Sequence, residues 1–253
     1  MLAYFLALRE GERIGVDSEF IDTLVVFGVP IAIVGARLYY VLFELDTFMS
    51  NPISILDIRG GGLAIYGGVI AGLIWGYWLC RKYDVDILRV IDLAAVGFLL
   101  GQSIGRWGNF MNQEAYGGVV SREFLEKLLI PDFIIDNMYI GGAYRHPTFL
   151  YESVWNIIGF FILIGLRRTK KLYVGDLGLM YLMWYGLGRA ILEGMRTDSL
   201  YLFNTVIRVS HLLSDLMVIG GTIIFVLRHI KQWRPQYYYE LLEENGADPK
   251  ELF

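Results

Sequence analysis

The stretch IDTLVVFGVPIAIVGARLYYVLF, residues 21–43, is an almost unbroken apolar run in which Asp22 and Arg37 are the charged residues. A bilayer with a hydrocarbon core about 30 Å thick is crossed by a helix of about 20 apolar residues, so this stretch predicts a membrane span. Five further blocks have the same character: Leu63–Cys80, Ile87–Ile104, Thr148–Leu166, Leu172–Leu192 and Val209–Leu227. The apolar stretch Leu2–Leu8 is too short to cross. We therefore predict an all-α polytopic membrane protein with six full transmembrane helices plus a partial first helix.

The composition agrees with this class. The 253 residues are 55% hydrophobic and 19% charged, include 29 glycines, and have a mean hydropathy of +0.47. Soluble domains contain about 25% charged residues, so the composition disfavours an ordinary soluble globule. High apolar content and a single cysteine, Cys80, also exclude a disordered chain and a disulfide-stapled fold, and a net charge of −4 gives no reason to expect nucleic acid.

Basic residues in the short connections predict the topology, because cytoplasmic loops carry an excess of Lys and Arg. They fall in alternate connections: Arg9 and Arg13; Arg81 and Lys82; Arg167, Arg168, Lys170 and Lys171; Arg228, Lys231 and Arg234. We expect these connections inside, a single transmembrane catalytic domain over residues 1–228, and a cytoplasmic tail over 229–253. Within that tail, His229 is expected at the surface, and residues 235–253 are expected to be solvated.

The connections predicted to face outward, 44–62, about 105–147 and about 193–208, contain Lys127 but are otherwise poor in lysine. Arginines nevertheless lie in or beside them: Arg37, Arg59, Arg106, Arg122, Arg145, Arg189, Arg196 and Arg208. Because cytoplasmic connections normally carry the excess of basic residues, these arginines on the outward side need another explanation.

Polar groups gather at the same outward ends of the predicted spans: Tyr66; Arg106, Asn109, Asn112 and Glu114; His146, Tyr151 and Glu152; Tyr185, Arg189, Glu193 and Arg196; His211 and Asp215. Ionisable groups at membrane depth are costly and usually functional, paired or cavity-facing. Guanidinium groups bind phosphate bidentately and stay charged. The pattern favours a membrane enzyme whose substrate has an anionic headgroup.

Other interpretations remain open. A transporter of an anionic solute or lipid would place polar groups near the bilayer midplane with symmetry between its halves, and the chain has no convincing internal repeat. A non-catalytic phospholipid-binding scaffold is a third possibility. Individually, Arg189 with Glu193 also fits a structural ion pair, Arg196 fits a snorkelling side chain, and Arg37 fits an interfacial anchor.

Several further features are interpreted as structural. The Gly68, Gly72 and Gly76 stripe is typical of close helix packing. His211 with Asp215 is interpreted as a polar pair, and Cys80 as a buried thiol on the inner side. The three histidines have no ligand spacing, so neither a protein-bound metal nor a cofactor is expected.

Five segments together carry a resemblance to a known family: GARLYYVLF at 35–43, GGLAIYGG at 61–68, GRWGNFMNQEAYG at 105–117, HPTFLYE at 146–152 and YGLGRAILEGMR at 185–196. In this order they resemble the bacterial prolipoprotein diacylglyceryl transferases, a family of seven-helix inner-membrane enzymes. By this resemblance, Leu2–Leu8 is similar to the end of a first helix.

The resemblance implies transfer of the sn-1,2-diacylglyceryl group from phosphatidylglycerol to the lipobox cysteine of a preprolipoprotein. A thioether forms and sn-glycerol 1-phosphate leaves. The nucleophile belongs to the substrate, so the enzyme needs no reactive cysteine of its own. The implied partners are phosphatidylglycerol, the preprolipoprotein and membrane lipid, with a monomeric enzyme in the bacterial cytoplasmic membrane whose site faces outward.

The resemblance also implies roles for individual residues. Arg106 and Arg189 match arginines tied to phosphatidylglycerol binding and catalysis. Glu193 is also expected to be catalytic, as is Tyr66 before the paired glycines. The residues expected to bind phosphatidylglycerol with the two arginines are Asn109, Glu114, His146, Tyr185 and Arg196, and Gly117 matches a further motif position.

Tyr66 departs from the pattern, because many members carry a histidine before the paired glycines. A histidine base suits neutral pH, whereas tyrosine has an ordinary pKa near 10. Either Tyr66 is strongly perturbed by the arginines, or it hydrogen-bonds the headgroup while another group takes the thiol proton. We favour the second alternative.

Overall fold

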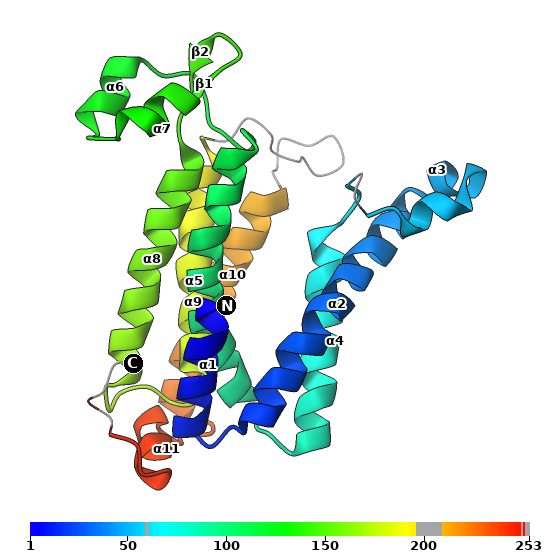
Figure 1. Ribbon diagram of the computed structural model, residues 1–253. Coiled ribbons are helices and arrows are strands. Elements are labelled where there is room, and N and C mark those ends of the chain that lie inside the picture. Colours follow the sequence, from blue (N-terminus) through cyan, green and yellow to red (C-terminus); the bar gives the residue numbers. More distant parts are fainter. Residues whose placement is uncertain (59–60, 196–208, 249, 251–253) are drawn as a thin grey trace. The chain divides into compact units, whose positions relative to one another are not determined.

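The computed structural model describes residues 1–58, 61–195, 209–248 and 250. The chain forms two compact units, one over Tyr4–Val90 and the other over Ile91–Phe253 together with Met1–Ala3. Figure 1 shows that nearly all of the described chain is helical, as predicted. Arg196, which the motif comparison singled out, lies outside the described residues.

The unit over Tyr4–Val90 is built around a helical hairpin. Its elements are α1 (Leu2–Arg13, from Tyr4 onward), α2 (Ser18–Phe43), α3 (Leu45–Ser50), the 3-10 helix η1 (Pro52–Leu56) and α4 (Ile65–Tyr83). α2 begins where the Asp17 carboxylate accepts a hydrogen bond from the backbone N–H of Glu19. α2 and α4 pack antiparallel, since Gly35 lies against Gly67 while the Trp75 indole N–H donates to the Leu24 carbonyl at 3.2 Å.

Glycines set the close approach of α2 and α4, but only partly at the predicted positions. A Cβ on Gly35 would lie 2.7 Å from the Gly67 carbonyl oxygen, so no larger residue fits at this crossing. In the predicted stripe, Gly68 does approach α2, with Ala32 O at 3.2 Å from its ideal Cβ. A Cβ on Gly72 would meet no described atom within 4 Å, so the packing interpretation is wrong at Gly72.

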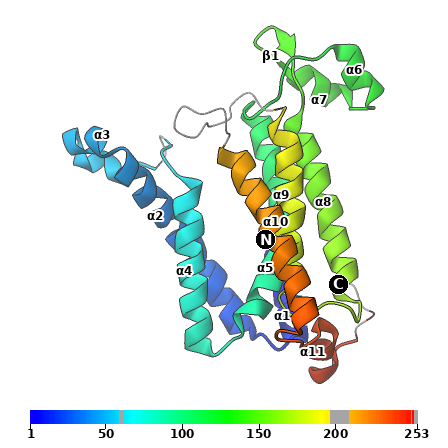
Figure 2. The ribbon, with the colours of Figure 1, turned by 180° about the vertical axis from the view of Figure 1, so that it is seen from behind.

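The second unit is a bundle of four long helices that run side by side in both views (Figures 1 and 2). They are α5 (Ile87–Met111, from Ile91 onward), α8 (Thr148–Arg167), α9 (Asp176–Glu193) and α10 (Val209–Lys231). A short helix, α11 (Tyr238–Glu244), lies at one end of this bundle, and a small folded head lies at the other (Figure 1).

Four helices in the described chain are long and apolar enough to cross a membrane: Ser18–Phe43, Ile87–Met111, Thr148–Arg167 and Ser210–Lys231. The prediction of a multi-pass helical membrane protein is confirmed. α4 and α9 form within the regions of the predicted blocks with shifted ends, but α9 carries Asp176, Arg189 and Glu193 within its 18 residues. The count of six spans therefore stays a prediction.

The head is the segment between α5 and α8, and it has its own core. It contains α6 (Arg122–Lys127), α7 (Asp132–Asn137) and the hairpin of β1 (Tyr139–Ile140) and β2 (Ala143–Tyr144), in which Tyr139 pairs with Tyr144. Its buried residues are Leu125, Ile130, Ile134, Ile135, Met138 and Phe149. Because Phe149 belongs to α8, the head is packed onto the end of the bundle.

Buried charges fix the opposite end of the bundle. The Asp92 carboxylate on α5 accepts hydrogen bonds from the N–H groups of Gly175 at 2.6 Å and Gly178 at 3.0 Å. The buried Asp176 carboxylate contacts Arg228 Nη1 at 2.8 Å and His229 Nε2 at 2.7 Å. The expectation that His229 is a surface residue is thus wrong, because its ring is half-buried against this carboxylate.

The C-terminal segment packs on this end rather than extending into solvent. Tyr238 donates its N–H to the Leu172 carbonyl at 2.8 Å, and Val174 donates its N–H to the Gln236 carbonyl at 3.0 Å. Tyr238, Leu241 and Leu242 are fully buried. The expectation that residues 235–253 are solvated is therefore wrong for α11, which packs against the connection between α8 and α9.

Candidate active site

Two arginines from different helices meet on one buried carboxylate. Arg106 Nε on α5 lies 2.7 Å from Glu152 Oε2 on α8, and Arg189 Nη1 on α9 lies 3.6 Å from Glu152 Oε1. The Glu152 side chain is 8% exposed, whereas those of Arg106 and Arg189 are 22% and 18% exposed. The Glu152 carboxylate is therefore more deeply buried than its two partners, and the guanidinium groups of Arg106 and Arg189 remain partly accessible.

Glu193 completes the cluster. Its carboxylate lies 2.9 Å from Arg189 Nη2, one helical turn along α9, and its side chain is 1% exposed. Among the described residues, the cluster therefore joins the guanidinium groups of Arg106 and Arg189 to the carboxylates of Glu152 and Glu193. The ion pair between Arg189 and Glu193 that we weighed as purely structural exists, and it is continuous with the contact to Glu152.

An open pocket adjoins Arg189. It is lined by Glu152, Trp155, Asn156, Tyr185, Gly188, Arg189 and Leu192. The Tyr185 ring stacks on Tyr181 with centroids 5.8 Å apart. The predicted grouping of Tyr185 with Arg189 on one face of α9 is confirmed by their shared pocket wall.

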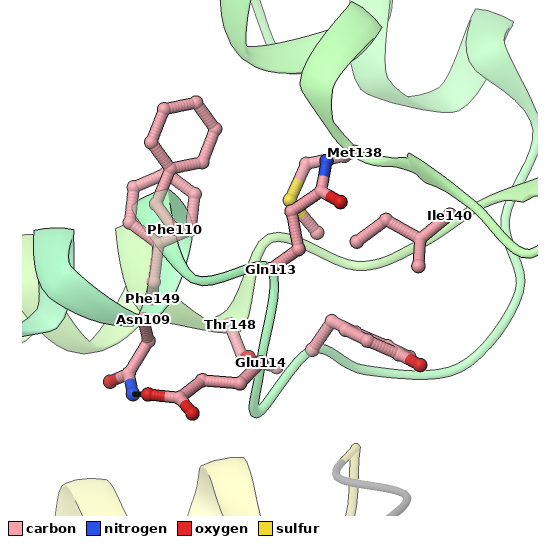
Figure 3. Close-up of a pocket in the computed structure, with 9 residues that line it drawn as sticks. Asn109, Phe110, Gln113, Glu114, Met138, Ile140, Thr148 and Phe149 are labelled. Atoms are coloured by element: carbon pink, nitrogen blue, oxygen red, sulfur yellow. Dashed lines mark hydrogen bonds between the residues drawn. The ribbon is translucent and has the colours of Figure 1, made fainter. Parts of the chain in front are cut away.

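A second open pocket lies where α5 meets the head (Figure 3). Its lining is Asn109, Phe110, Gln113, Glu114, Tyr116, Met138, Ile140, Thr148 and Phe149. Asn109 Nδ2 donates to Glu114 Oε1 at 2.8 Å, the bond drawn in Figure 3, and Arg106 Nη1 lies 3.4 Å from Asn109 Oδ1. Arg106 therefore contacts residues of both pockets, Glu152 in one and Asn109 in the other.

Reciprocal hydrogen bonds join α5 to α8 beside the arginine cluster. Ser103 Oγ donates to the Ser153 carbonyl at 3.0 Å, and Ser153 Oγ donates to the Ser103 carbonyl at 2.9 Å. Trp107 Nε1 also donates to Ser153 Oγ at 3.2 Å. Because Ser103 precedes Arg106 by one helical turn and Ser153 follows Glu152, these buried bonds hold the helices that carry the ion pair.

A matching arrangement joins α8 to α9. The Trp155 and Trp184 indoles stack at 4.4 Å, and each N–H donates to the other residue's backbone carbonyl at 3.0 and 3.1 Å. A Cβ on Gly159 would overlap the Trp184 indole, and a Cβ on Gly188 would overlap that of Trp155. Glycine at these two positions is what admits the paired indoles between α8 and α9.

His146 lies at the base of the head. Its Nδ1 is 3.3 Å from the Tyr151 hydroxyl, and its ring meets the Phe124 ring edge to face. Burial lowers the pKa of His146, so the imidazole is neutral at pH 7. Gly117 packs against it, since a Cβ there would lie 2.7 Å from His146 Cβ. These contacts brace the start of α8 and leave the predicted headgroup role of His146 a proposal.

Arg37, one of the outward arginines, serves the backbone of its own unit. Its buried guanidinium donates to the carbonyls of Ile55 at 2.8 Å, Ser54 at 2.6 Å, Gly61 at 3.0 Å and Gly62 at 2.9 Å. These four bonds occupy most of its five N–H groups. Arg37 therefore holds the connection between α2 and α4, which explains its presence without a bound phosphate.

Of the remaining predicted residues, Tyr66 begins α4 in the Tyr4–Val90 unit, half exposed, with its ring tilted against Tyr39 at 6.5 Å. His211 and Asp215 do form a pair, at 3.2 Å on α10, and both side chains are half exposed. In the described residues, no group of three His, Cys, Asp or Glu side chains is arranged to hold a metal ion.

Glu152 is the site residue that the sequence did not identify as catalytic or substrate-binding, although it ends the HPTFLYE motif. The available signal was a carboxylate inside an apolar block of membrane-spanning length, which needs a cationic partner. The carboxylates of the cluster hold the two guanidinium groups in place, and both groups can then bind an anion. Each guanidinium has five N–H donors, more than its described partners use.

Comparisons with known proteins identify the family to which the chain belongs. A family model described as prolipoprotein diacylglyceryl transferase matches residues 1–227. A phosphatidylglycerol–prolipoprotein diacylglyceryl transferase of Bacillus cereus (strain G9842) is 49% identical over 238 residues, covering 94% of this chain and 87% of that protein. Proteins of the same name from Bacillus anthracis (strain CDC 684 / NRRL 3495) and Staphylococcus xylosus are 48% and 46% identical, each over 94% of this chain and over 87% and 84% of their own lengths. The resemblance inferred from the motifs is confirmed, and the chain belongs to the prolipoprotein diacylglyceryl transferase family.

Proposed function

We propose that this chain transfers the diacylglyceryl group of phosphatidylglycerol to the lipobox cysteine of a preprolipoprotein, the first step of lipoprotein maturation. The observation that carries the proposal is the Arg106–Glu152–Arg189 cluster in a chain whose relatives are named for this reaction. The alternative of an anionic-solute transporter has no such support from the relatives.

The chemistry is a displacement at carbon. The cysteine sulfur attacks the glycerol carbon that carries the phosphate, a C–S bond forms, and the C–O bond to phosphate breaks. The thiol proton leaves to a base, and sn-glycerol 1-phosphate departs with the bonding electron pair. The phosphate changes from a monoanionic diester to a dianionic monoester, so negative charge grows on the leaving group.

Arg106 and Arg189 are proposed to bind that phosphate and stabilise the added charge. Positively charged donors held in place where charge develops are usually the largest catalytic contribution. Glu152 and Glu193 keep the guanidinium groups from turning toward water or each other, because each carboxylate is buried and within ion-pair distance of at least one arginine. The two carboxylates therefore act as positioning residues in this proposal, with Glu193 at the far side of Arg189.

Asn109 and Glu114 are proposed to bind the hydroxyls of the lipid's terminal glycerol. Asn109 contacts Arg106 directly and donates in turn to Glu114, so together they offer an amide and a carboxylate in the pocket wall. Tyr185, Arg196 and His146 are proposed to line the same substrate region by their motif positions. A charged phosphate bound at Arg106 would then place its glycerol within reach of Asn109.

Tyr66 is proposed to hydrogen-bond the headgroup rather than to remove the thiol proton. Full transfer activity in Tyr66→Phe would exclude a proton-transfer role, whereas a gain in Tyr66→His at neutral pH would indicate that a base is useful at this position. Comparing the two variants in one assay separates the alternatives.

The topology is also a proposal. We infer six membrane spans within one catalytic domain over residues 1–228, with the Arg106 end of the bundle facing outward and the C-terminus in the cytoplasm, in a monomeric enzyme. The distribution of basic residues supports this orientation, since they gather at or just after the C-terminal ends of α4, α8 and α10.

The direct test of the assigned roles replaces a guanidinium by an ammonium group. Arg106→Lys and Arg189→Lys keep the charge but lose the planar fork, so we expect each to lower thioether formation at least about 100-fold. The assay uses purified protein, phosphatidylglycerol vesicles and a lipobox peptide, with Arg81→Lys at the exposed end of α4 as the matched control. Wild-type turnover by Arg106→Lys would overturn the assignment.

A further inference from the structure

The turn that joins α6 to α7, together with the start of α7, carries large apolar side chains on its outside. Leu128 and Phe133 are about half exposed, and Leu129 is 90% exposed. Leu129 also has a φ of 55°, a left-handed conformation that leucine seldom adopts. The backbone therefore holds an apolar side chain outward at some conformational cost.

The same turn is well packed on its inner side. Leu125 and Ile130, which flank the two leucines, are buried in the head core. Leu129 and Ile130 donate their N–H groups to the carbonyls of Glu126 at 2.9 Å and Leu125 at 3.3 Å. The turn is thus an ordered element with distinct inner and outer faces, and its outer leucines are not part of the head's own core.

The position of the head places this turn beside the lipid. α8 begins at Thr148 and has 20 residues, so it rises about 30 Å, the thickness of the hydrocarbon core. α6 and α7 extend sideways from that end of α8, and the turn between them forms the outer edge of the head (Figures 1 and 2). A bilayer around the bundle would therefore reach its boundary next to this turn.

Charges near the turn are paired among themselves. Arg122 contacts Glu126 and Asp136 at 2.8 Å and Asp132 at 3.2 Å. Lys127 pairs with Glu123 at 2.8 Å. No cationic patch is formed by these residues, so attraction of the turn to lipid would depend on apolar burial and not on the charge of the headgroups.

We propose that Leu128, Leu129 and Phe133 insert into the phospholipid leaflet at the Arg106 end of the bundle. The partner is the bilayer itself, at the boundary between headgroups and acyl chains. The insertion tethers the head, which supplies Met138 and Ile140 to the wall of the pocket beside Arg106. The tether thereby limits the motion of that wall, independently of which reaction the pocket serves.

The test measures the depth of Leu129 in a membrane. The single cysteine, Cys80, is buried, so Leu129→Cys in a Cys80→Ser protein takes one nitroxide label. In vesicles of phosphatidylglycerol and phosphatidylcholine, we expect the label to be more accessible to oxygen than to a soluble nickel chelate, equally in low and high salt. Tyr139→Cys, in β1 on the other side of the head (Figure 1), is the matched control and should favour the chelate.

The opposite accessibility at Leu129 would overturn the proposal. Oxygen access that arises only after a lipobox peptide is added would also overturn it, and would indicate a protein partner. If the Leu129 variant is not recovered folded, the label at Phe133→Cys decides by the same criterion.

Discussion

Replacing Glu152 by glutamine separates the charge of the bridging carboxylate from its shape. Glutamine has nearly the same volume, but its amide is neutral and presents a donor where one guanidinium requires an acceptor. The wild-type carboxylate makes contacts of 2.7 Å to Arg106 and 3.6 Å to Arg189 from a buried position. Hydrogen bonds to charged groups contribute about 1.5–3 kcal/mol each, so the arginines lose their main constraint.

Two effects of the Glu152→Gln change oppose each other. Removing a negative charge raises the local positive potential and strengthens phosphate binding, which lowers KM. Displacing a catalytic group by about 1 Å costs about 100-fold in rate, which corresponds to about 2.7 kcal/mol at 1.36 kcal/mol per factor of ten. Because the guanidinium groups are partly exposed and the binding gain is screened, we expect the rate loss to dominate.

The assay is steady-state diacylglyceryl transfer from phosphatidylglycerol to a fluorescent lipobox peptide. We expect kcat to fall about 100-fold while KM for the lipid stays level or falls. Glu123→Gln, an exposed carboxylate on α6 paired with Lys127, is the matched control and should keep wild-type kcat. A Glu152→Gln enzyme with kcat within about threefold of wild type would refute the positioning role.

Three further predictions concern packing, buried charge and pH. Gly188→Ala should force the Trp155 indole from its site and lower both Tm and the transfer rate, because overpacking costs about 1–3 kcal/mol. Gly165→Ala, with open space at its Cβ, is the control and should leave both unchanged in thermal melts and activity assays. Arg37→Lys should lower Tm by several degrees in a thermal melt, since one ammonium does not reach the four carbonyls that the guanidinium binds. Burial lowers the pKa of His146, so below pH about 6.5 the unfolded chain binds more protons than the folded chain does. The stability of the wild-type protein should therefore fall as the pH drops through this range. His146→Phe should show a smaller fall in Tm between pH 7.5 and 5.5.

Apolar blocks predicted the long helices well, but their ends depended on local chemistry. The block predicted to end at Ile104 continues as helix to Met111, which places Arg106 and Asn109 on the same face of α5. α9 begins at Asp176 instead of Leu172, because Gly175 adopts a φ of 97° at the helix start. Hydropathy measures lipid solubility, and it carries little information on where capping ends a helix.

The site was predicted in part. Its arginines are conspicuous because basic residues are otherwise depleted from the outward connections, whereas nothing in the sequence marks Glu152 as their partner. Arg106 and Arg189 were expected together, and the structure joins them through Glu152, far from both in sequence. Arg37 belonged to the same predicted pattern, yet it binds backbone carbonyls. Only three-dimensional contacts distinguish an arginine that faces a pocket from one that holds a loop.

The C-terminal segment was misjudged for a related reason. Its tyrosines and glutamates are typical of a solvated tail, but Tyr238 and Leu242 are buried against residues 172–174. The apolar side chains of α11 occupy one side of a helix too short to show a clear pattern. Burial here depends on a partner segment that local sequence does not identify.

The measurement that tests the central claim most directly is mass spectrometry of a lipobox peptide after incubation with the purified protein and phosphatidylglycerol. We expect the cysteine to gain one diacylglyceryl group in thioether linkage, with release of glycerol phosphate, and the product to be nearly absent with Arg106→Lys. An unmodified cysteine with the folded wild-type protein, or equal product with Arg106→Lys, would contradict the account.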